Sequence, residues 1–120
     1  MGLFGKLFSK PYRNVSIVQA RALLDDGAVL VDVRTNQEWN AGHAPVARHL
    51  SLESLDRGAS GLRQERVVVT ICRTGARSTR AARMLASKGY TVASVRGGMY
   101  AWQRSGGPVV AKNGRKGEVV

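Results

Sequence analysis

Short apolar runs divide the chain, and they have the character of buried strands. The clearest run covers residues 67–72, where β-branched side chains occupy successive rather than alternate positions. This pattern is typical of a strand that is buried on both faces of a parallel sheet. Residues 28–33 form a second buried strand and residues 91–95 a third. Shorter extended segments are predicted at residues 14–15, at an edge of the sheet, and at residues 47–50.

Helical patterns separate these strands. Ser16 with Gln19, and Thr35 with Glu38, have the spacing of a capping box, in which two side chains satisfy backbone N–H groups at a helix start. Apolar residues recur with a period near 3.6 over residues 78–88. Further short helical segments are predicted at residues 52–55 and 99–104. Strands that alternate with helices at these lengths predict an α/β fold, a single domain with a central, mostly parallel sheet and helices on both faces.

The 120 residues are enough for one domain, and the pattern divides them into three parts. Residues 13–106 carry the alternating strands and helices. Residues 1–12 form an N-terminal arm with an apolar side. Contact of this arm with an anionic membrane is conceivable but not favoured, because so short a helix is marginal in water. Residues 107–120 mix glycine with basic residues and have little to bury, so we predict a flexible basic tail.

Composition limits the classes of function. A single cysteine excludes an internal disulfide framework, and two histidines give no spacing typical of a metal site, so we expect neither a metal nor another cofactor. No segment reaches the roughly 20 apolar residues of a membrane span, and the first ten residues lack the features of a signal peptide. A protein of this kind is expected in a reducing compartment, the cytoplasm.

The net charge of +11 is the strongest compositional signal. A basic chain attracts nucleic acids and other anions. Here, however, the basic residues are spread along the whole sequence, with no interleaved aromatic residues and no helix-turn-helix or RNA-binding signature. A specific nucleic-acid function is therefore not favoured, and small anions remain as candidate ligands.

The only cysteine, Cys72, stands at the position with the most chemical character. It ends the central strand, and a short loop that contains Arg73 and Arg77 leads from it into the next helix. Open α/β sheets bind their ligands at this carboxyl edge. Unpaired backbone N–H groups, the helix dipole and the two arginines all favour a thiolate over a thiol. A lone cysteine is often an inert buried residue, but this context favours a nucleophile.

Four segments of the chain resemble the single-domain rhodaneses, which are sulfurtransferases, and the resemblance runs over about residues 15–106. In chain order the segments are Leu30-Val31-Asp32-Val33-Arg34 with Glu38-Trp39, Gly42-His43-Ala44-Pro45, Cys72-Arg73-Thr74-Gly75-Ala76-Arg77-Ser78, and Gly97-Gly98-Met99-Tyr100-Ala101-Trp102. One such segment alone is a weak match, whereas four at these spacings are specific.

The resemblance implies that Cys72 is the catalytic residue and cycles through a persulfide. Its thiolate attacks the outer sulfur of an anionic donor such as thiosulfate and expels sulfite, and cyanide, a cellular thiol or a protein acceptor then takes the sulfur. The N–H groups of the loop are expected to cradle the persulfide, and the loop arginines to bind the anion. The residues expected to bind the substrate are those that follow the cysteine: Arg73, Thr74, Gly75, Ala76, Arg77 and Ser78. Asp32 and Arg34 are expected to support the site by an ion pair or hydrogen bonds.

Other polar and aromatic residues are assigned structural roles. Ser78 is expected either to cap the helix after the loop or to direct its hydroxyl into the loop. Glu38 is expected to cap its helix, and His43 to fix its turn by hydrogen bonds. Trp39 and Trp102 are expected to lie in the core.

Loop length separates this chemistry from that of the related cell-cycle phosphatases. Those enzymes need a cysteine, five residues and then an arginine that holds the phosphate, but Ser78 stands in that position here and Arg77 comes one place early. Two other interpretations remain open. One is a sulfur-relay component whose donor and acceptor are both proteins. The other is a non-enzymatic module for binding or redox sensing, in which Cys72 is oxidised as the signal.

Overall fold

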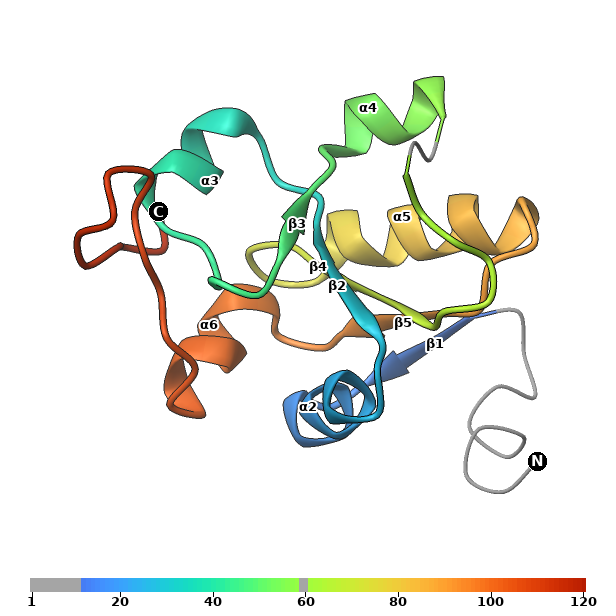
Figure 1. The fold of residues 1–120 in the computed structure, drawn as a ribbon, viewed down its shortest axis with the longest axis horizontal. Coiled ribbons are helices and arrows are strands. Elements are labelled where there is room, and N and C mark those ends of the chain that lie inside the picture. Colours follow the sequence, from blue (N-terminus) through green and yellow to red (C-terminus); the bar gives the residue numbers. More distant parts are fainter. Residues whose placement is uncertain (1–11, 59–60) are drawn as a thin grey trace.

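The computed structural model describes residues 12–58 and 61–120, which form a sheet between two layers of helices (Figure 1). The strands are β1 (Tyr12–Val15), β2 (Val29–Asp32), β3 (Arg48–His49), β4 (Val68–Ile71) and β5 (Val92–Val95). The helices are α2 (Ile17–Asp25), α3 (Asn36–Ala41), α4 (Leu52–Arg57), α5 (Ala76–Ser87) and α6 (Gly98–Arg104). Within these described residues, no helix is long and apolar enough to cross a membrane. The arm predicted at residues 1–12 lies outside the described residues, apart from its last residue.

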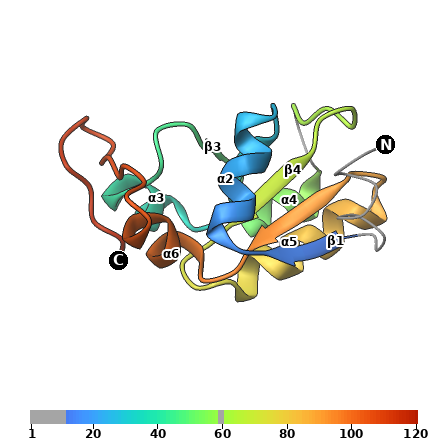
Figure 2. The same cartoon turned by 90° about the horizontal axis from the view of Figure 1, so that it is seen from below.

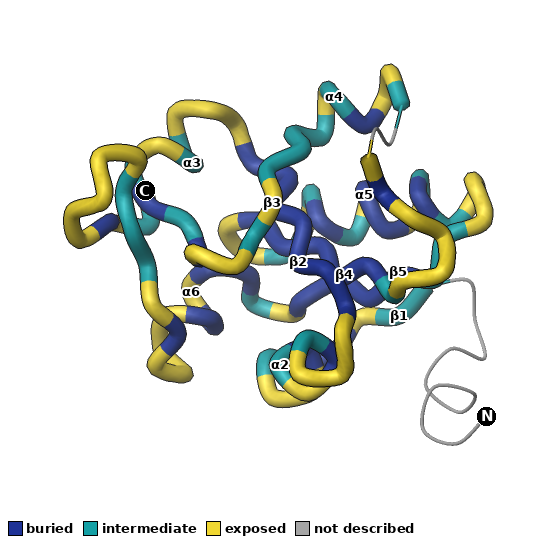
Figure 3. Tube along the Cα trace, viewed as in Figure 1, coloured by how far each residue is buried: buried dark blue, intermediate teal, exposed yellow. Residues whose placement is uncertain are grey.

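The five strands form one sheet in the order β1-β5-β4-β2-β3, and every neighbouring pair is parallel. The prediction of a central parallel sheet is therefore confirmed. β4 is the middle strand, and all four of its residues are buried, as Figure 3 shows for the centre of the sheet. Parallel strands all end at the same edge, so Cys72, which follows β4, and Asp32, which ends β2, lie at one edge of the sheet.

Successive side chains of each strand enter two separate apolar layers. In and after β4, Val69 and Ile71 pack in the layer that contains α2 and α6, whereas Val68 and Cys72 pack in the layer that contains α4 and α5. Figure 2 shows α2 crossing one face of the strands and α5 lying behind the other. This alternation directs the Cys72 side chain toward α5.

Two predicted helix starts are confirmed, and both are made by side chains. At α2, the Ser16 hydroxyl accepts the Gln19 N–H (3.1 Å) and the Gln19 side chain accepts the Ser16 N–H (3.0 Å). Thr35 and Glu38 form the same reciprocal pair at α3 (3.2 and 3.1 Å). Such pairs satisfy N–H groups that have no partner inside the helix, which is why the sequence shows where these helices begin.

The helix after the loop begins earlier than the expected start near residue 78. α5 starts at Ala76 and Gly75 is its N-cap residue, so Ser78 lies in the first turn and does not cap the helix. Gly75 has φ of +130°, a backbone conformation that side chains with a Cβ rarely adopt. The glycine therefore makes the turn into the helix without a capping side chain. A start of this kind leaves no capping signal in the sequence.

The C-terminal segment differs from the flexible tail predicted from its composition. Residues 107–120 fold back beside α3 (Figure 1), and an antiparallel bridge joins Val110 to His43. The Lys112 N–H also donates to the carbonyl of Asn40 (2.9 Å). The segment is held mainly by backbone hydrogen bonds, and Gly42 and Gly117 allow the two backbones to approach closely. Backbone contacts of this kind are not revealed by the polar composition of the segment.

Candidate active site

The candidate site is the loop that connects β4 to α5. Thr70, in β4, donates from its hydroxyl to the carbonyl of Ser78 in α5 (2.8 Å), so strand and helix are tied together on either side of the loop. Both residues are fully buried. Cys72 comes directly after β4 and is only 1% exposed. The cysteine is therefore held between a rigid strand and the first turn of a helix.

Two polar groups lie against the cysteine sulfur. The Gly75 N–H donates to Cys72 Sγ at an N···S distance of 3.1 Å, and the Ser78 hydroxyl oxygen lies 3.5 Å from the sulfur. Backbone N–H groups at a helix start and hydroxyl groups both stabilise an anionic sulfur. Of the six loop residues predicted to bind the substrate, two contact the sulfur: Gly75 through its backbone N–H and Ser78 through its hydroxyl.

Ser78 belongs to a chain of hydroxyl groups that extends away from the sulfur. Its oxygen lies 2.8 Å from the Ser94 oxygen, and its own proton is donated to the carbonyl of Gly75 (3.0 Å). Because that proton is engaged, the Ser78 oxygen accepts hydrogen bonds from the Cys72 thiol and from Ser94. Thr79 also donates to the Gly75 carbonyl (2.9 Å).

This arrangement can serve a sulfur atom that changes its charge. If the thiol loses its proton, the Ser78 hydroxyl can rotate to donate to the sulfur. The Gly75 carbonyl then keeps the Thr79 hydroxyl and the Thr79 N–H (3.1 Å) as donors. The Ser94 hydroxyl continues to donate to Ser78. No buried group loses its last partner in this exchange, so it carries little desolvation cost.

Ser94 is a site residue that the sequence analysis missed. It lies in β5, opposite Thr70 of β4, and is 1% exposed. The available signal was a hydroxyl residue inside an otherwise apolar run that was predicted to be a buried strand. Buried hydroxyl groups need partners, and here the partner is the serine beside the cysteine.

The start of α6 supports the loop from the other side. Gly98 has φ of +54°, and a Cβ at this position would collide with the carbonyl oxygens of Cys72 and Arg73. The next residue, Met99, donates its N–H to the Cys72 carbonyl (2.8 Å). Only glycine allows the backbone of α6 to approach this closely. Gly98 therefore helps to position the active loop.

Arg77 is paired within the protein. Its Nη1 and Nη2 donate to the two carboxylate oxygens of Glu38 at 2.6 and 2.8 Å. The hydrogen bonds from Arg77 lower the pKa of Glu38 from 4.5 to about 2, against the opposing effect of burial. The hydrogen bond to Glu38 likewise raises the pKa of Arg77. Glu38 thus does more than cap α3, because it also ties this helix to the active loop.

The Arg77 side chain is 34% exposed and lines a small cavity of about 190 Å³ together with the first residues of α3 and α4. Arg73, Thr74 and Ala76 are exposed on the loop. These four residues form the solvent-facing side of the candidate site. Cys72 itself does not line the cavity.

Asp32 and Arg34 form an ion pair on the other face of the sheet. Asp32 is in register with Ile71, so it lies on the side of α2 and α6, whereas Cys72 points to α5. Arg34 donates to Asp32 (2.7 Å) and to the carbonyl of Gly42 (2.6 Å), and both charged side chains are fully buried. Among the described residues, none accepts a hydrogen bond from Arg34 Nη1. The pair joins the end of β2 to the turn after α3.

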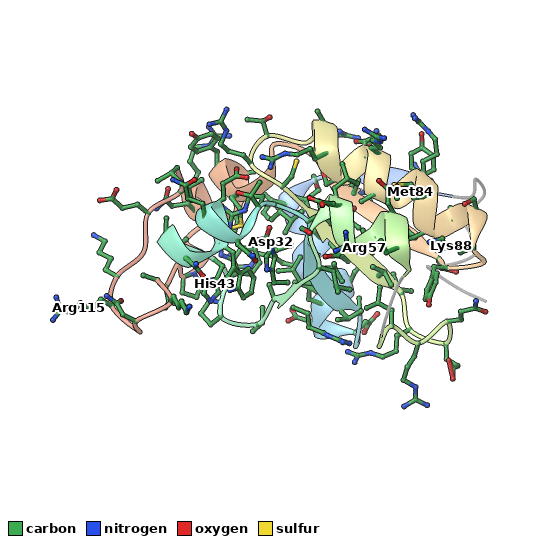
Figure 4. The ribbon with its side chains drawn as sticks, turned by 90° about the horizontal axis from the view of Figure 1, so that it is seen from above. Asp32, His43, Arg57, Met84, Lys88 and Arg115 are labelled. Carbon is green, nitrogen blue, oxygen red and sulfur yellow. The ribbon has the colours of Figure 1, made fainter. Side chains whose placement is uncertain are left out.

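An aromatic stack lies beside this ion pair. The His43 ring stacks on Trp39 at a centroid distance of 3.6 Å, and the His49 ring stacks on the same indole at 4.9 Å. His43 Nδ1–H donates to the Trp39 carbonyl, and His49 Nε2–H to that of Arg34 (both 2.7 Å), since a carbonyl only accepts. Figure 4 shows Asp32 inside the molecule and His43 on its side toward the C-terminal segment. Trp39 is half-buried rather than part of the main core.

No metal centre adjoins these clusters. Within residues 12–58 and 61–120, no three His, Cys, Asp or Glu side chains come together in a way that could hold a metal ion.

Comparison with known proteins gives relatives over most of the chain. The model of the rhodanese-like domain family matches residues 16–105. A sulfurtransferase of Allochromatium vinosum is 40% identical over 100 residues, which are 82% of this chain and 92% of that protein. Thiosulfate sulfurtransferase GlpE of Actinobacillus pleuropneumoniae serotype 3 is 35% identical over 103 residues, which are 84% of this chain and 95% of that protein.

Solved structures agree with this relationship. A rhodanese-related protein from Thermoplasma volcanium superposes with a TM-score of 0.76 at 25% identity, over 84% of this chain and 100% of that chain. A rhodanese homolog from Thermus thermophilus gives a TM-score of 0.64 at 33% identity, over 74% of this chain and 99% of that chain. The resemblance found in four sequence segments is confirmed. The chain belongs to the rhodanese-like domain family of sulfurtransferases.

Proposed function

We propose that this protein transfers sulfane sulfur from a thiosulfate-like anion, through a persulfide on Cys72, to a thiol or to cyanide. The observation that carries the proposal is the contact of Cys72 Sγ with the Gly75 N–H and the Ser78 hydroxyl. A thiolate and the terminal sulfur of a persulfide both carry negative charge. The same donors therefore stabilise the enzyme before and after it accepts sulfur.

The reaction proceeds in two substitutions at sulfur. In the first, the Cys72 thiolate attacks the outer sulfur of thiosulfate, the S–S bond of the donor breaks and its electron pair leaves with sulfite. In the second, cyanide or a thiolate attacks the outer sulfur of the persulfide, and Cys72 leaves as a thiolate. The products are thiocyanate or a new persulfide, and the enzyme returns to its starting state.

The loop around the nucleophile binds the anionic donor. Arg73 and Thr74 are exposed beside Cys72 and contact the donor as it approaches. Gly75 and Ala76 supply backbone at the start of α5, and the Ser78 hydroxyl, which accepts from the Cys72 thiol, rotates to donate to the thiolate. Arg77 holds its position through Glu38 and adds positive charge near the thiolate. Asp32 and Arg34 support the site through the fold rather than by contact with the donor.

The size of the site favours sulfur over phosphate. Cys72 is 1% exposed, so the transferred group has to be small. The position at which a phosphatase would need its phosphate-binding arginine is occupied by Ser78, whose side chain is fully buried and bonded within the site. A single sulfur atom meets both conditions and a phosphoryl group does not.

The acceptor and the compartment follow from the same chemistry. The outer sulfur of a persulfide is transferred readily to a small thiol or to a cysteine of another protein. Both acceptors must be in the reduced thiol form. The single cysteine of this chain is also unpaired in the structure. A reducing compartment such as the cytoplasm is the corresponding location.

The test is the intact mass of the protein after incubation with thiosulfate. The wild type should gain the mass of one sulfur atom, and the addition of cyanide should remove it with release of thiocyanate. Cys72→Ser should show no gain, whereas the exposed-residue control Arg104→Ala should gain sulfur like the wild type.

Two outcomes would contradict the proposal. A sulfur adduct that persists in Cys72→Ser would show that the site is misassigned. A wild-type protein that never gains sulfur, while Cys72 still reacts with iodoacetamide, would favour a binding or redox-sensing module over a transferase.

A further inference from the structure

A groove of about 540 Å³ is lined mainly by residues of α2, β2, α6 and the segment that leads into β3. None of its lining residues belongs to the active loop. The active loop, in contrast, connects β4 to α5 (Figure 1). Its volume is in the range of known binding sites. The groove is therefore a second feature, separate from the site of sulfur chemistry.

Three arginines line this groove, and each is anchored by neutral groups. Arg21 donates to the carbonyl and hydroxyl oxygens of Ser105 (both 3.1 Å). Arg48 donates to the carbonyl of Gly61 (3.0 Å). Arg66 donates to the carbonyl of Gly27 through Nε and Nη2 (3.0 and 2.8 Å). These bonds fix the positions of the guanidinium groups without neutralising their charge.

The positive charge of the groove is mostly uncompensated. All eight acidic residues of the chain lie in the part that the structure describes, and none forms an ion pair with Arg21, Arg48 or Arg66 there. One acidic residue, Asp25, lines the groove, so three positive charges face one negative charge. An arginine without a carboxylate partner is well suited to bind an external carboxylate through two parallel hydrogen bonds.

The same groove offers apolar surface between the charges. Val46 is 66% exposed and presents an apolar side chain to the solvent. Leu24, which is half-buried, also lines the groove. Trp102 lies at its base: it is only 4% exposed, and Arg21 covers its indole with the guanidinium carbon 5.2 Å from the ring centroid. Arginine beside exposed aliphatic groups in one concave site is typical of the anchor regions of protein interfaces.

We propose that this groove docks an acidic segment of a partner protein, with an apolar side chain between acidic residues. The three arginines belong to different parts of the fold and have separate anchors, so they match several carboxylates along a segment better than the single head group of a small anion. The apolar side chain lies against Val46 and Leu24, and the carboxylates bind the arginines around them. The surface does not depend on Cys72 and can serve any partner of this chemistry.

The test uses a fluorescein-labelled peptide of sequence EDLFEDE and the full-length protein. Fluorescence anisotropy should give saturable binding, and Arg48→Glu should weaken it by about tenfold because an attraction is replaced by a repulsion. Arg80→Glu is the matched control: it changes the net charge by the same amount, but Arg80 is an exposed residue of α5 that does not line the groove. It should weaken binding by less than about twofold.

The apolar contact is tested separately. Val46→Ser keeps the charge and changes an exposed side chain, so folding is retained. This substitution should weaken the binding of EDLFEDE by about threefold. The affinity for the charge-matched peptide EDSSEDE should stay the same. When EDLFEDE is added to the wild-type protein, the amide NMR shifts of Leu24, Val46 and Trp102 should change.

Equal weakening by Arg48→Glu and Arg80→Glu would show only unspecific attraction to a basic protein, and it would overturn the proposal. Amide NMR shift changes that are confined to the active loop would also overturn the proposal. Cys72→Ser should bind the peptide like the wild type, so this result is independent of the outcome of the sulfur-transfer test.

Discussion

Two polar clusters lie at the carboxyl edge of the sheet, on opposite faces, and they handle charge in different ways. On the α5 side, the two groups in contact with the Cys72 sulfur, the Gly75 N–H and the Ser78 hydroxyl, are neutral. On the α6 side, Asp32 and Arg34 are both charged, fully buried and paired with one another. One cluster can adapt to a change of charge, and the other is fixed.

The difference follows from position along the strands. Asp32 and the residue beside it in β4, Ile71, share one face of the sheet, and Cys72 comes one residue later and so takes the other face. Hydroxyl groups gather where the charge of the sulfur changes, because a rotating O–H can act as donor or acceptor. A buried ion pair cannot adjust in this way, but it holds β2 and the turn after α3 in one arrangement. We expect the first cluster to govern rate and the second to govern stability.

The largest effect is expected for Arg34→Met. This change leaves the carboxylate of Asp32 buried without its partner, which should lower the free energy of unfolding by about 3–5 kcal/mol. Urea unfolding followed by tryptophan fluorescence measures the loss. In the fraction that remains folded, the rate at which iodoacetamide modifies Cys72 should stay within about twofold of the wild type, because Arg34 does not contact the sulfur.

The double variant Arg34→Met with Asp32→Leu checks the cause. It removes both charges and should recover much of the lost stability. If the double variant is less stable than Arg34→Met, the ion pair is not the reason for the loss. If Arg34→Met slows alkylation of the folded protein strongly, the two clusters are not separate.

A smaller effect is expected for Glu38→Gln, which tests the connection between α3 and the active loop. Glutamine can still form the capping box but cannot form the ion pair with Arg77. The pKa of Glu38 is about 2 in the folded protein and 4.5 without the fold, so the ionised carboxylate stabilises the folded state above pH 4.5, and this contribution is lost as the pH falls toward 2. Because the Arg77 side chain is one-third exposed, we expect a loss of about 1–3 kcal/mol at neutral pH.

The measurement is the difference in unfolding free energy between wild type and Glu38→Gln at several pH values. This difference in unfolding free energy should have its largest value at pH 7 and should shrink toward zero near pH 2. Glu53→Gln is the control, because its pair with Arg57 is highly exposed and should contribute little at any pH. A difference that does not depend on pH would contradict the role of the Glu38 charge.

The fold could be predicted because its signals are local. Buried strands require apolar residues at successive positions, and the helices α2 and α3 are started by the side chains of Ser16 and Thr35. The start of α5 was misplaced because Gly75 makes it through its backbone alone. The C-terminal segment was expected to be flexible from its glycine-rich and basic composition. Backbone hydrogen bonds hold it beside α3 instead, and such bonds leave no pattern in the side chains.

The candidate site could be located but not assembled from the sequence. Cys72 and its loop follow from a nucleophile between a strand and a helix. That Arg77 pairs with Glu38, 39 residues away, depends on how α3 lies against α5, and no short spacing encodes it. Ser94 and Gly98 contribute through contacts between separate strands and helices. Residues that act on the nucleophile through another residue carry no motif of their own.

The smallest of the three effects is expected for Ser94→Ala, which addresses the hydroxyl cluster directly. Without the Ser94 hydroxyl, the Ser78 oxygen loses one donor, so its hydroxyl is a weaker donor to an anionic sulfur. The loss of one neutral hydrogen bond is about 1 kcal/mol, which corresponds to about a fivefold decrease in the rate of persulfide formation with thiosulfate. The thermal midpoint should change little, since Thr79 still donates to the Gly75 carbonyl and alanine fits the space of serine.

Ser87→Ala, which removes an exposed hydroxyl at the end of α5, is the matched control and should leave the rate unchanged. If Ser94→Ala reacts as fast as the control, or loses rate only in proportion to its loss of folded protein, the hydroxyl cluster is structural like the ion pair, and the distinction between the two faces of the sheet does not hold.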